Sequence, residues 1–465
     1  MAGVSAFLWF AVFAVCWTTF FCSGCKGGAR SRTHCRAGSP GVSHVSICRP
    51  RKKDVCDDLE SLREAMRKLE CLLVVYENQE SADPDLPVLM TNLHDEIVEK
   101  LVARNRWDGD AAIWETLYFY TSRLNAVRNS SAKESKIPVY SVNGHHMAAA
   151  YWIEASRKQP VKTLLHFDSH ADTRAVADPD KILKLGKNIL KGEDVDNSRE
   201  ALGKYLRDPA VPISAAVLVL GIKRLVWAKP SWYNLTDFVS RVFFYGKHVS
   251  PAPGKETISN KWELFYDRSA DPVDDPEIPP DSTWKILDDS AEDLGEFSHV
   301  RKLLLSVLTT NPWPEETARQ EEMKKRLLKA VPRGRFILDI DLDYFASVDL
   351  TKDLAPGVVP ASYSDRRKYL SAEAVKKREE TWRDHRVSME KRLDELEEIL
   401  RFLRDNGRMP MVVTVADSTR MPFSIHWWAQ QYWEYTPKRF VPYLQHRVRL
   451  LLARVYEADS MKAVL

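Results

Sequence analysis

Apolar side chains recur every three or four residues through residues 57–128, as they do on the buried face of a helix. Similar patterns come near 92–104 and 112–124. The first set comprises Leu59, Leu62, Met66, Leu69 and Leu73. The spacing predicts a helical extension over residues 54–137 at the N-terminal side of the main domain.

From residue 138 onward the pattern changes to short, continuous apolar runs separated by polar or helix-like segments. The runs lie at 138–142, 162–167, 214–222, 241–245, 335–343 and 411–416. Strands this apolar, joined by long connections, are typical of a parallel sheet that helices cover on both faces. The pattern therefore predicts an α/β fold over residues 138–465, with a doubly wound parallel sheet.

Two segments interrupt this alternation and predict insertions. Residues 250–296 combine six prolines with many acidic residues, which is typical of a loop on the surface. Residues 364–405 are more than half charged and carry leucines along one face, which predicts a long amphipathic helix or a pair of helices. That helix either packs on the domain with a solvated outer face, or serves as a lid or an oligomer contact.

Charge separates the first 53 residues from the rest of the chain. Residues 1–23 have no charged side chain, and residues 24–53 contain eight Lys or Arg and no Asp or Glu. The net charge of the 465 residues is +3, so subtracting these eight positive charges leaves −5 for residues 54–465. A mildly acidic body argues against nucleic acid as a partner. All seven cysteines lie within the first 71 residues, which excludes thiolate chemistry from residues 72–465.

The uncharged, apolar run at residues 4–22 predicts a targeting segment or a membrane attachment. Its length lies between that of a signal-peptide core and that of a short membrane span. A cleaved signal peptide would direct the protein into the secretory pathway, whereas an uncleaved anchor would hold it at a membrane. Residues 24–53, rich in Arg, Ser and Gly, resemble a transit peptide, so the two segments together could also form a bipartite leader for an organelle. The sequence leaves these three destinations open.

The stretch KTLLHFDSHAD at residues 162–172 carries the clearest chemistry. An apolar strand ends, and three metal-competent side chains follow at alternate positions. In an extended chain Asp168, His170 and Asp172 would share one face. They follow the carboxyl end of a strand, where open α/β sheets bind their ligands. Because such groups are costly to bury together without a cation, the pattern predicts a metal site.

A second apolar strand, RFILDIDLDYF at residues 335–345, repeats the arrangement with Asp339, Asp341 and Asp343 on one face. A third short strand ends in Asn-Gly-His-His, and His145 or His146 is a further candidate ligand. Carboxylates and imidazoles without sulfur favour Mn²⁺ or another hard to borderline divalent ion, with Zn²⁺ as an alternative.

Together these motifs resemble the metal signature of the arginase/deacetylase (ureohydrolase-like) superfamily. The resemblance rests on the D-x-H-x-D at 168–172, the later D-x-D and a His upstream. More narrowly, HFDSHAD and DIDLDYF are similar to the motifs of a eukaryotic and bacterial family that has an arginase-like fold and no agreed substrate. The resemblance covers roughly residues 138–345 and 411–457. It implies a parallel sheet that carries two Mn²⁺ ions at its carboxyl edge.

A ligand set also follows from the resemblance. Carried over to this chain, it makes Asp168 the bridge between the two ions. Asp172 and His145 would complete one site, and His170 would belong to the other.

In the second motif the resemblance implies that one aspartate bridges the ions and that its partner completes the second site. Asp341 and Asp343 are favoured because they lie nearer the carboxyl edge, and Asp339 would then support the ligands from behind. His145 is preferred to His146 on spacing.

Hydrolysis is the chemistry that such a site supports. Two cations lower the pKa of a bridging water and polarise the group that is attacked. The resemblance implies a C–N bond of a guanidine or amide in a small molecule. Residues 173–180 (TRAVADPD) replace the Asn-rich stretch of arginases, which argues against arginase activity. Asp172 adds a carboxylate that a one-zinc deacetylase site would not need. The alternative is a non-catalytic metal-binding or interaction protein on the same fold.

Two further residues are candidates for catalysis. Asp417 follows the apolar run 411–416 and could recognise a cationic group of the substrate, or cap the turn that follows. His426 could shuttle protons, or pack beside the two tryptophans that follow it. Aromatic residues in the same stretch could line a pocket or belong to the core; they are Trp427, Trp428, Tyr432, Trp433 and Tyr435.

Overall fold

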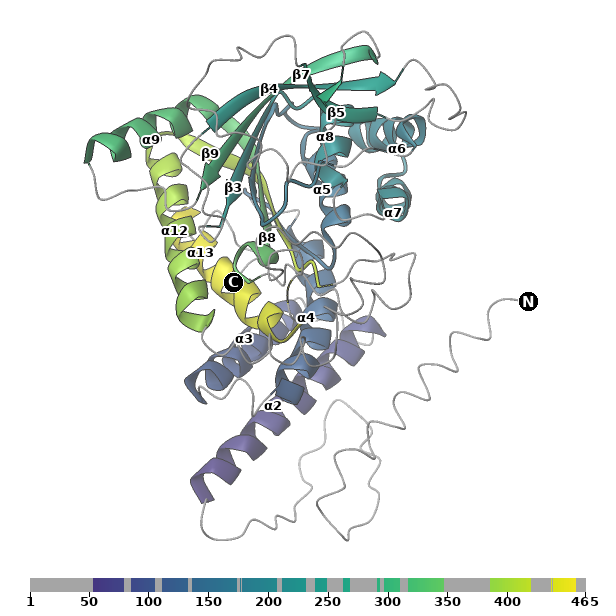
Figure 1. Ribbon diagram of the computed structural model, residues 1–465. Helices are drawn as coiled ribbons and strands as arrows, with labels where there is room; N and C mark the ends of the chain where they lie inside the picture. Colours follow the sequence, from purple (N-terminus) through teal and green to yellow (C-terminus); the bar gives the residue numbers. More distant parts are fainter. Residues whose placement is uncertain are drawn as a thin grey trace, which may run out of the picture. The chain divides into compact units, whose positions relative to one another are not determined.

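A nine-stranded sheet organises the described part of the chain in this computed structural model (Figure 1). The strand order is β1-β9-β8-β2-β3-β7-β4-β5-β6. The strands are β1 (Val139–Val142), β2 (Thr163–Phe167), β3 (Arg224–Lys229), β4 (Val239–His248), β5 (Trp262–Asp267), β6 (Ala291–Glu292), β7 (Phe297–Thr309), β8 (Gly334–Asp341) and β9 (Arg408–Ala416).

The structure describes residues 53–78, 85–104, 111–132, 136–173, 176, 178–206, 211–230, 239–248, 262–267, 291–292, 297–309, 317–346, 385–419, 436 and 438–456. Asp57–Leu465 form one compact unit.

Parallel pairing runs through the first six strands of this order. β1 pairs with β9, β9 with β8, β8 with β2, β2 with β3, and β3 with β7, all in the parallel sense. β4 then pairs antiparallel with β7, and β5 pairs antiparallel with β4. The carboxyl ends of the parallel strands therefore meet at one edge of the sheet, as the α/β prediction requires.

Helices cover both faces of the sheet, which confirms the predicted α/β class (Figure 1). The buried core on one face of the sheet also includes side chains of α2 (Lys53–Glu77), α3 (Leu86–Arg104), α4 (Ala111–Ala132), α9 (Thr317–Ala330), α12 (His385–Asp405) and α13 (Val441–Tyr456). The core on the other face includes side chains of α5 (Ala148–Ala155), α6 (Pro179–Lys191), α7 (Val195–Leu206) and α8 (Pro212–Leu220).

Alternation along the central strands divides their side chains between the two faces. Leu165 and Phe167 of β2 join the core on the α12 and α13 side, whereas Leu164 joins the core on the α5 and α8 side. In β8, Leu338 joins the core on the α12 and α13 side, and Ile337 joins the core on the α5 and α8 side. Because side chains of a strand alternate, residues at even spacing from Leu164 face α5. This face is the one that carries the polar groups described below.

The helical extension joins the core of the main domain. Leu62 and Leu69 of α2 belong to the same buried cluster as the sheet residues of that face. An ion pair ties α3 to α13, since Arg449 Nη2 donates to Asp95 Oδ1 at 2.5 Å. On α4, Asn129 pairs with the main chain of Ser141 on the edge strand β1, at 2.7 and 2.9 Å.

Strands were predicted correctly at 138–142, 162–167, 241–245, 335–343 and 411–416, but the prediction for 214–222 is wrong. This run is the helix α8, with Pro212 in its first turn and Gly221 as a left-handed cap at φ 61°. A short apolar run fits a buried helix as well as a buried strand, and only the flanking Pro and Gly distinguish them. The strands β3 and β7 were missed, and β4 is antiparallel rather than parallel.

Both predicted insertions are described in part. β5 and β6 lie within 250–296 and extend the sheet beyond β4, so the prediction of a surface loop is wrong for these residues. Within 364–405, the structure describes α12, whose apolar face is buried in the domain core through Leu393, Leu396, Leu400 and Leu403. The oligomer contact proposed for this segment stays a prediction.

The predicted leader lies outside the described residues, which begin at 53. This holds for the apolar run 4–22 and for most of the basic segment. No helix within the described part of the chain is both long enough and apolar enough to span a membrane.

Candidate metal centre

At the carboxyl end of β2 the chain turns and presents Asp168, His170 and Asp172. The predicted extended arrangement of these residues is wrong. The His170 amide donates to Asp168 Oδ1 at 2.5 Å, and Asp172 has a φ of 50°, so this segment is a tight turn. Trp227 of β3 anchors the turn by donating from Nε1 to the Asp168 carbonyl at 3.0 Å. The turn, rather than strand alternation, brings the three side chains together.

The second motif divides between a strand and a helical turn. Asp339 and Asp341 lie in β8 two residues apart and face the same side. Asp343 lies in the 3₁₀ turn η4 (Leu342–Tyr344), so the prediction of three carboxylates along one strand is wrong for this residue. Asp341 caps that turn, because its Oδ1 accepts from the Asp343 amide at 3.2 Å. Asp343 Oδ1 accepts from the Ser169 amide at 3.1 Å, which joins the two motifs.

His145 enters the centre from the 3₁₀ turn η1 (His145–Met147), which follows β1. Its ring is fully buried, and Nδ1 makes a short contact with Asp172 Oδ2. The same nitrogen lies 3.3 Å from Asp341 Oδ2 and 3.5 Å from Asp168 Oδ2. His146 belongs to none of the clusters of possible ligands among the described residues.

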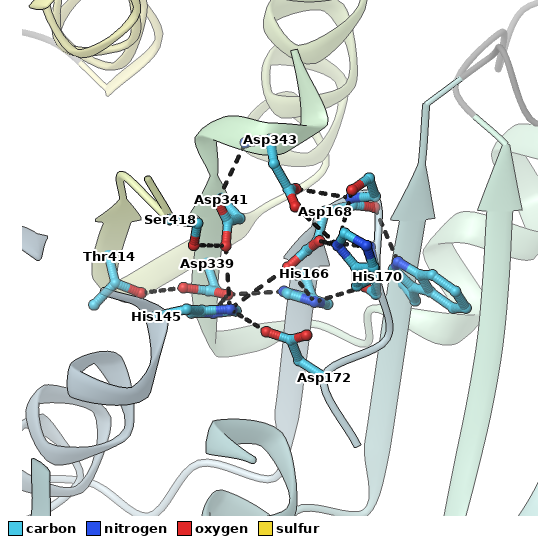
Figure 2. A network of polar contacts seen from close by, with 12 residues as sticks. His145, His166, Asp168, His170, Asp172, Asp339, Asp341, Asp343, Thr414 and Ser418 are labelled. Atoms are coloured by element: carbon cyan, nitrogen blue, oxygen red, sulfur yellow. Dashed lines mark hydrogen bonds and ion pairs between the residues drawn. The ribbon is translucent and has the colours of Figure 1, made fainter. Parts of the chain in front are cut away.

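Two clusters that could each hold a metal ion result from this arrangement (Figure 2). The ligand atoms within each cluster lie within 4.8 Å of one another, and Asp168 belongs to both. We call them the inner cluster, formed by His145, Asp168, Asp172 and Asp341, and the outer cluster, formed by Asp168, His170 and Asp343. The inner cluster is buried throughout, whereas the side chain of His170 in the outer cluster is 30% exposed. All six predicted ligand residues are thus in one place, and their binding of metal stays a prediction.

The donor atoms of both clusters suit a divalent cation. Each cluster offers imidazole nitrogen and carboxylate oxygen without sulfur, a set typical of hard to borderline ions. Asp168 Oδ2 is buried and has no well-formed hydrogen bond within the described residues, although His166 Nε2 lies 3.2 Å away. A buried carboxylate oxygen that is not fully hydrogen-bonded is costly unless a cation neutralises it. The residues therefore fit the metal that the sequence motifs imply.

Crowded charges shift the pKa values of these groups strongly. Burial, together with the charges of Asp343 and Asp172, raises the pKa of Asp168 to about 6. Burial and the charges of Asp343 and Asp168 also raise the pKa of Asp341 well above its usual range. Burial alone would lower the pKa of His145, but Asp339 and Asp172 outweigh that effect and raise it. Without a cation, the raised pKa values of these groups favour their protonated forms. The bound protons then offset the negative charge that a metal ion would otherwise neutralise.

We expect the affinity for Mn²⁺ to rise with pH, because these protons must leave before metal binds. Asp168, with a pKa of about 6, is mostly protonated at pH 5 and mostly ionised at pH 7. Protonation of Asp168 alone should weaken Mn²⁺ binding about tenfold at pH 5 relative to pH 7. Protonation of the histidine ligands should weaken it further. Calorimetric titration in buffers of different ionisation enthalpy measures both the affinity and the protons released. An affinity that does not change over this range would mean that other groups bind the metal.

A row of polar side chains lies one step deeper in the sheet. His166 of β2, Asp339 of β8 and Thr414 of β9 are register partners on adjacent strands. All three are fully buried. His145, His166 and Asp339 also form a third cluster of possible ligand atoms. Sequence analysis missed His166 and Thr414, and the only sequence signal was polar character at even spacing from Asp168 and within the run 411–416.

The two residues predicted to act in catalysis are described unequally. Asp417 lies directly after β9 and is fully buried, and neither carboxylate oxygen has a well-formed hydrogen bond within the described residues. Burial raises its pKa to about 7, although the Thr419 amide and the Tyr118 hydroxyl oppose the shift. The next residue, Ser418, donates a short hydrogen bond to Asp341. His426 and the aromatic residues near it lie outside the described residues.

Comparison with known proteins leaves the family open. No model of a known protein family matches the chain, and no curated protein matches it. The mostly parallel sheet and the buried His/Asp clusters are compatible with an arginase-like fold and with a metal-dependent hydrolase.

Proposed function

We propose that this protein is a metal-dependent hydrolase of the arginase/deacetylase superfamily that cleaves a C–N bond in a small molecule. The observation that carries the proposal is the pair of ligand clusters that share Asp168 at the carboxyl edge of the sheet. Two motifs 171 residues apart, counted from Asp168 to Asp339, converge there with a histidine from a third strand end. A buried carboxylate common to two clusters is what a two-ion centre requires.

The proposed cofactor is a pair of divalent ions, with Mn²⁺ preferred and Zn²⁺ as the alternative. Oxygen outnumbers nitrogen in both clusters, which favours the harder ion. The inner cluster offers three carboxylates and one imidazole, and the outer cluster two carboxylates and one imidazole. Such a pair of ions supplies an activated water and polarises the carbon that is attacked.

Residues of the chain then orient the substrate and exclude water. The partly exposed ring of His170 marks the outer cluster as the side from which a small molecule approaches, since the inner cluster is buried. Asp417 is the proposed contact for a cationic part of the substrate, such as a guanidinium. With its pKa near 7, its carboxyl group can be neutral when free and ionised beside a cation. An uncharged amide substrate would leave this group protonated.

Turnover of a substrate panel tests the proposal. The full-length protein, loaded with Mn²⁺, is assayed against guanidines, acyl-amines and ureides, with release of amine, ammonia or urea as the readout. We expect hydrolysis of at least one class that depends on metal and is lost in Asp168→Ala. Arginine is expected to be a poor substrate, because residues 173–180 lack the Asn-rich stretch of arginases. Metal-loaded protein that hydrolyses no member of the panel would favour a non-catalytic metal-binding protein.

A further inference from the structure

The buried row of His166, Asp339 and Thr414 lies directly behind the inner cluster. In β8, Asp339 precedes the ligand Asp341 by two residues and faces the same side. In β2, His166 precedes Asp168 by two residues in the same way. The row therefore lies two residues further from the carboxyl edge than the ligands Asp168 and Asp341. Its three side chains are fully buried. Side chains this polar persist in a core only where their hydrogen bonds are satisfied.

Asp339 uses both carboxylate oxygens within this row (Figure 2). Its Oδ2 accepts from His145 Nε2 at 2.6 Å and lies 2.8 Å from His166 Nδ1. Its Oδ1 accepts from Thr414 Oγ1 at 2.5 Å. Thr414 is held in turn by Trp152 of α5, which donates from Nε1 at 2.8 Å. The carboxylate is thereby held by side chains from η1, β2 and β9, and α5 in turn holds Thr414 of β9.

The contacts around Asp339 are hydrogen bonds rather than the ligands of a third metal ion, because His145 already faces the inner cluster with its other ring nitrogen, Nδ1. The 2.6 and 2.8 Å separations around Asp339 Oδ2 are those of charge-assisted hydrogen bonds. An ion at this place would also require the His145 ring to give up both of its protons. Asp339 therefore acts as an acceptor.

His166 balances the charge of Asp339. Its Nδ1 faces Asp339, and its Nε2 faces the His170 carbonyl oxygen and Asp168 Oδ2, both at 3.2 Å. Because both ring nitrogens face oxygen atoms, both carry hydrogens in the best hydrogen-bonded arrangement. A cationic His166 makes an ion pair with Asp339, and this pair lets Asp339 stay ionised in the core.

The orientation of His145 follows from these contacts. A hydrogen on Nε2, donated to Asp339, leaves the lone pair of a neutral ring on Nδ1. Nδ1 is the atom that faces Asp168, Asp172 and Asp341 of the inner cluster. A carboxylate behind a ligating histidine selects the tautomer and raises the basicity of the ligand atom. The outer cluster contains no contact to Asp339 among the described residues.

We propose that Asp339 is a positioning residue that holds His145 with its proton on Nε2, and that it thereby sets the metal affinity of the inner cluster separately from that of the outer cluster. Thr414 and His166 hold Asp339 in place. This inference rests on the proposed two-ion centre and assigns a role to side chains that do not touch the ions.

Titration of full-length, metal-free protein with Mn²⁺ tests the inference. For the wild type we expect two binding steps and a spin-coupled manganese pair in the electron paramagnetic resonance spectrum. Asn in Asp339→Asn keeps the shape of the side chain but removes the charged acceptor. We expect this variant to weaken one step by about 10- to 100-fold and to leave the other within about threefold. With one equivalent of Mn²⁺ it should give the spectrum of isolated ions.

Thr414→Val provides a second, milder variant, because it removes the donor to Asp339 Oδ1 and leaves the carboxylate in place. We expect it to weaken the same step about threefold or more, and it carries the test if Asp339→Asn does not fold. His146→Ala is the matched control, since His146 neighbours His145 and lies outside the three clusters. Mn²⁺ affinities equal to the wild type in Asp339→Asn or Thr414→Val, or equal weakening of both binding steps, would overturn the role of Asp339. Such a result would leave the two-ion centre in place. Wild-type protein that binds no Mn²⁺ would overturn the two-ion centre as well.

Discussion

Asp168→Ala is expected to remove both metal ions from the protein and to reduce any hydrolytic activity to background. Asp168 is the residue that the inner and outer clusters share, so its loss removes a ligand from each. The metal-free fold should survive the change. Burial and neighbouring negative charges raise the pKa of Asp168 to about 6, which means that its ionised form destabilises the metal-free protein at neutral pH. Elemental analysis of the purified protein measures the metal content.

Asp180→Ala is a suitable control for this experiment. Asp180 is an exposed carboxylate in the first turn of α6 and belongs to none of the three clusters. We expect two ions per chain in this control and in the wild type, and essentially none in Asp168→Ala. A full metal content in Asp168→Ala would contradict the assignment of the centre.

Mn²⁺ is expected to raise the stability of the metal-free wild type by several kcal/mol. An ion that binds only the folded state stabilises it by about 2.7 kcal/mol at a free concentration one hundred times its dissociation constant, so two ions contribute about 5 kcal/mol. Urea denaturation in chelator and in excess Mn²⁺ measures the difference. Asp168→Ala should lose the whole effect. Asp172→Asn, which alters only the inner cluster, should lose about half of it. An equal response of all three proteins would indicate that Mn²⁺ binds elsewhere.

Most of the parallel sheet could be predicted from local patterns. The runs that became β1, β2, β8 and β9 are short, apolar and bounded by polar residues, and these features are visible in the sequence. The run 214–222 is equally short and apolar, yet it forms α8, because Ala215 and Ala216 favour a helix and Gly221 ends it. β7 was missed because its polar residues, such as Arg301 and Lys302, interrupt the apolar pattern of a strand near the sheet's antiparallel end.

The ligand residues of the proposed centre could also be predicted, although not their local geometry. The resemblance of short motifs predicted six ligand residues, and the structure brings them together. They are His145, Asp168, His170, Asp172, Asp341 and Asp343. The prediction assumed extended chains, whereas Asp172 and Asp343 lie in turns. Alternation in a strand is a local rule, and it stops applying where the strand ends. Where each strand ends depends on its neighbours in the sheet.

By itself, then, the sequence determined which residue types follow the carboxyl ends of the central strands, and hence that a cation site was to be expected at that edge. Only the tertiary structure decided which side chains stand behind the ligands. His166, Asp339 and Thr414 share a row because β2, β8 and β9 pair in one particular register, and a shift by one residue would turn these side chains to the opposite face. That register depends on hydrogen bonds and packing between segments 75 to 173 residues apart, which no local pattern contains.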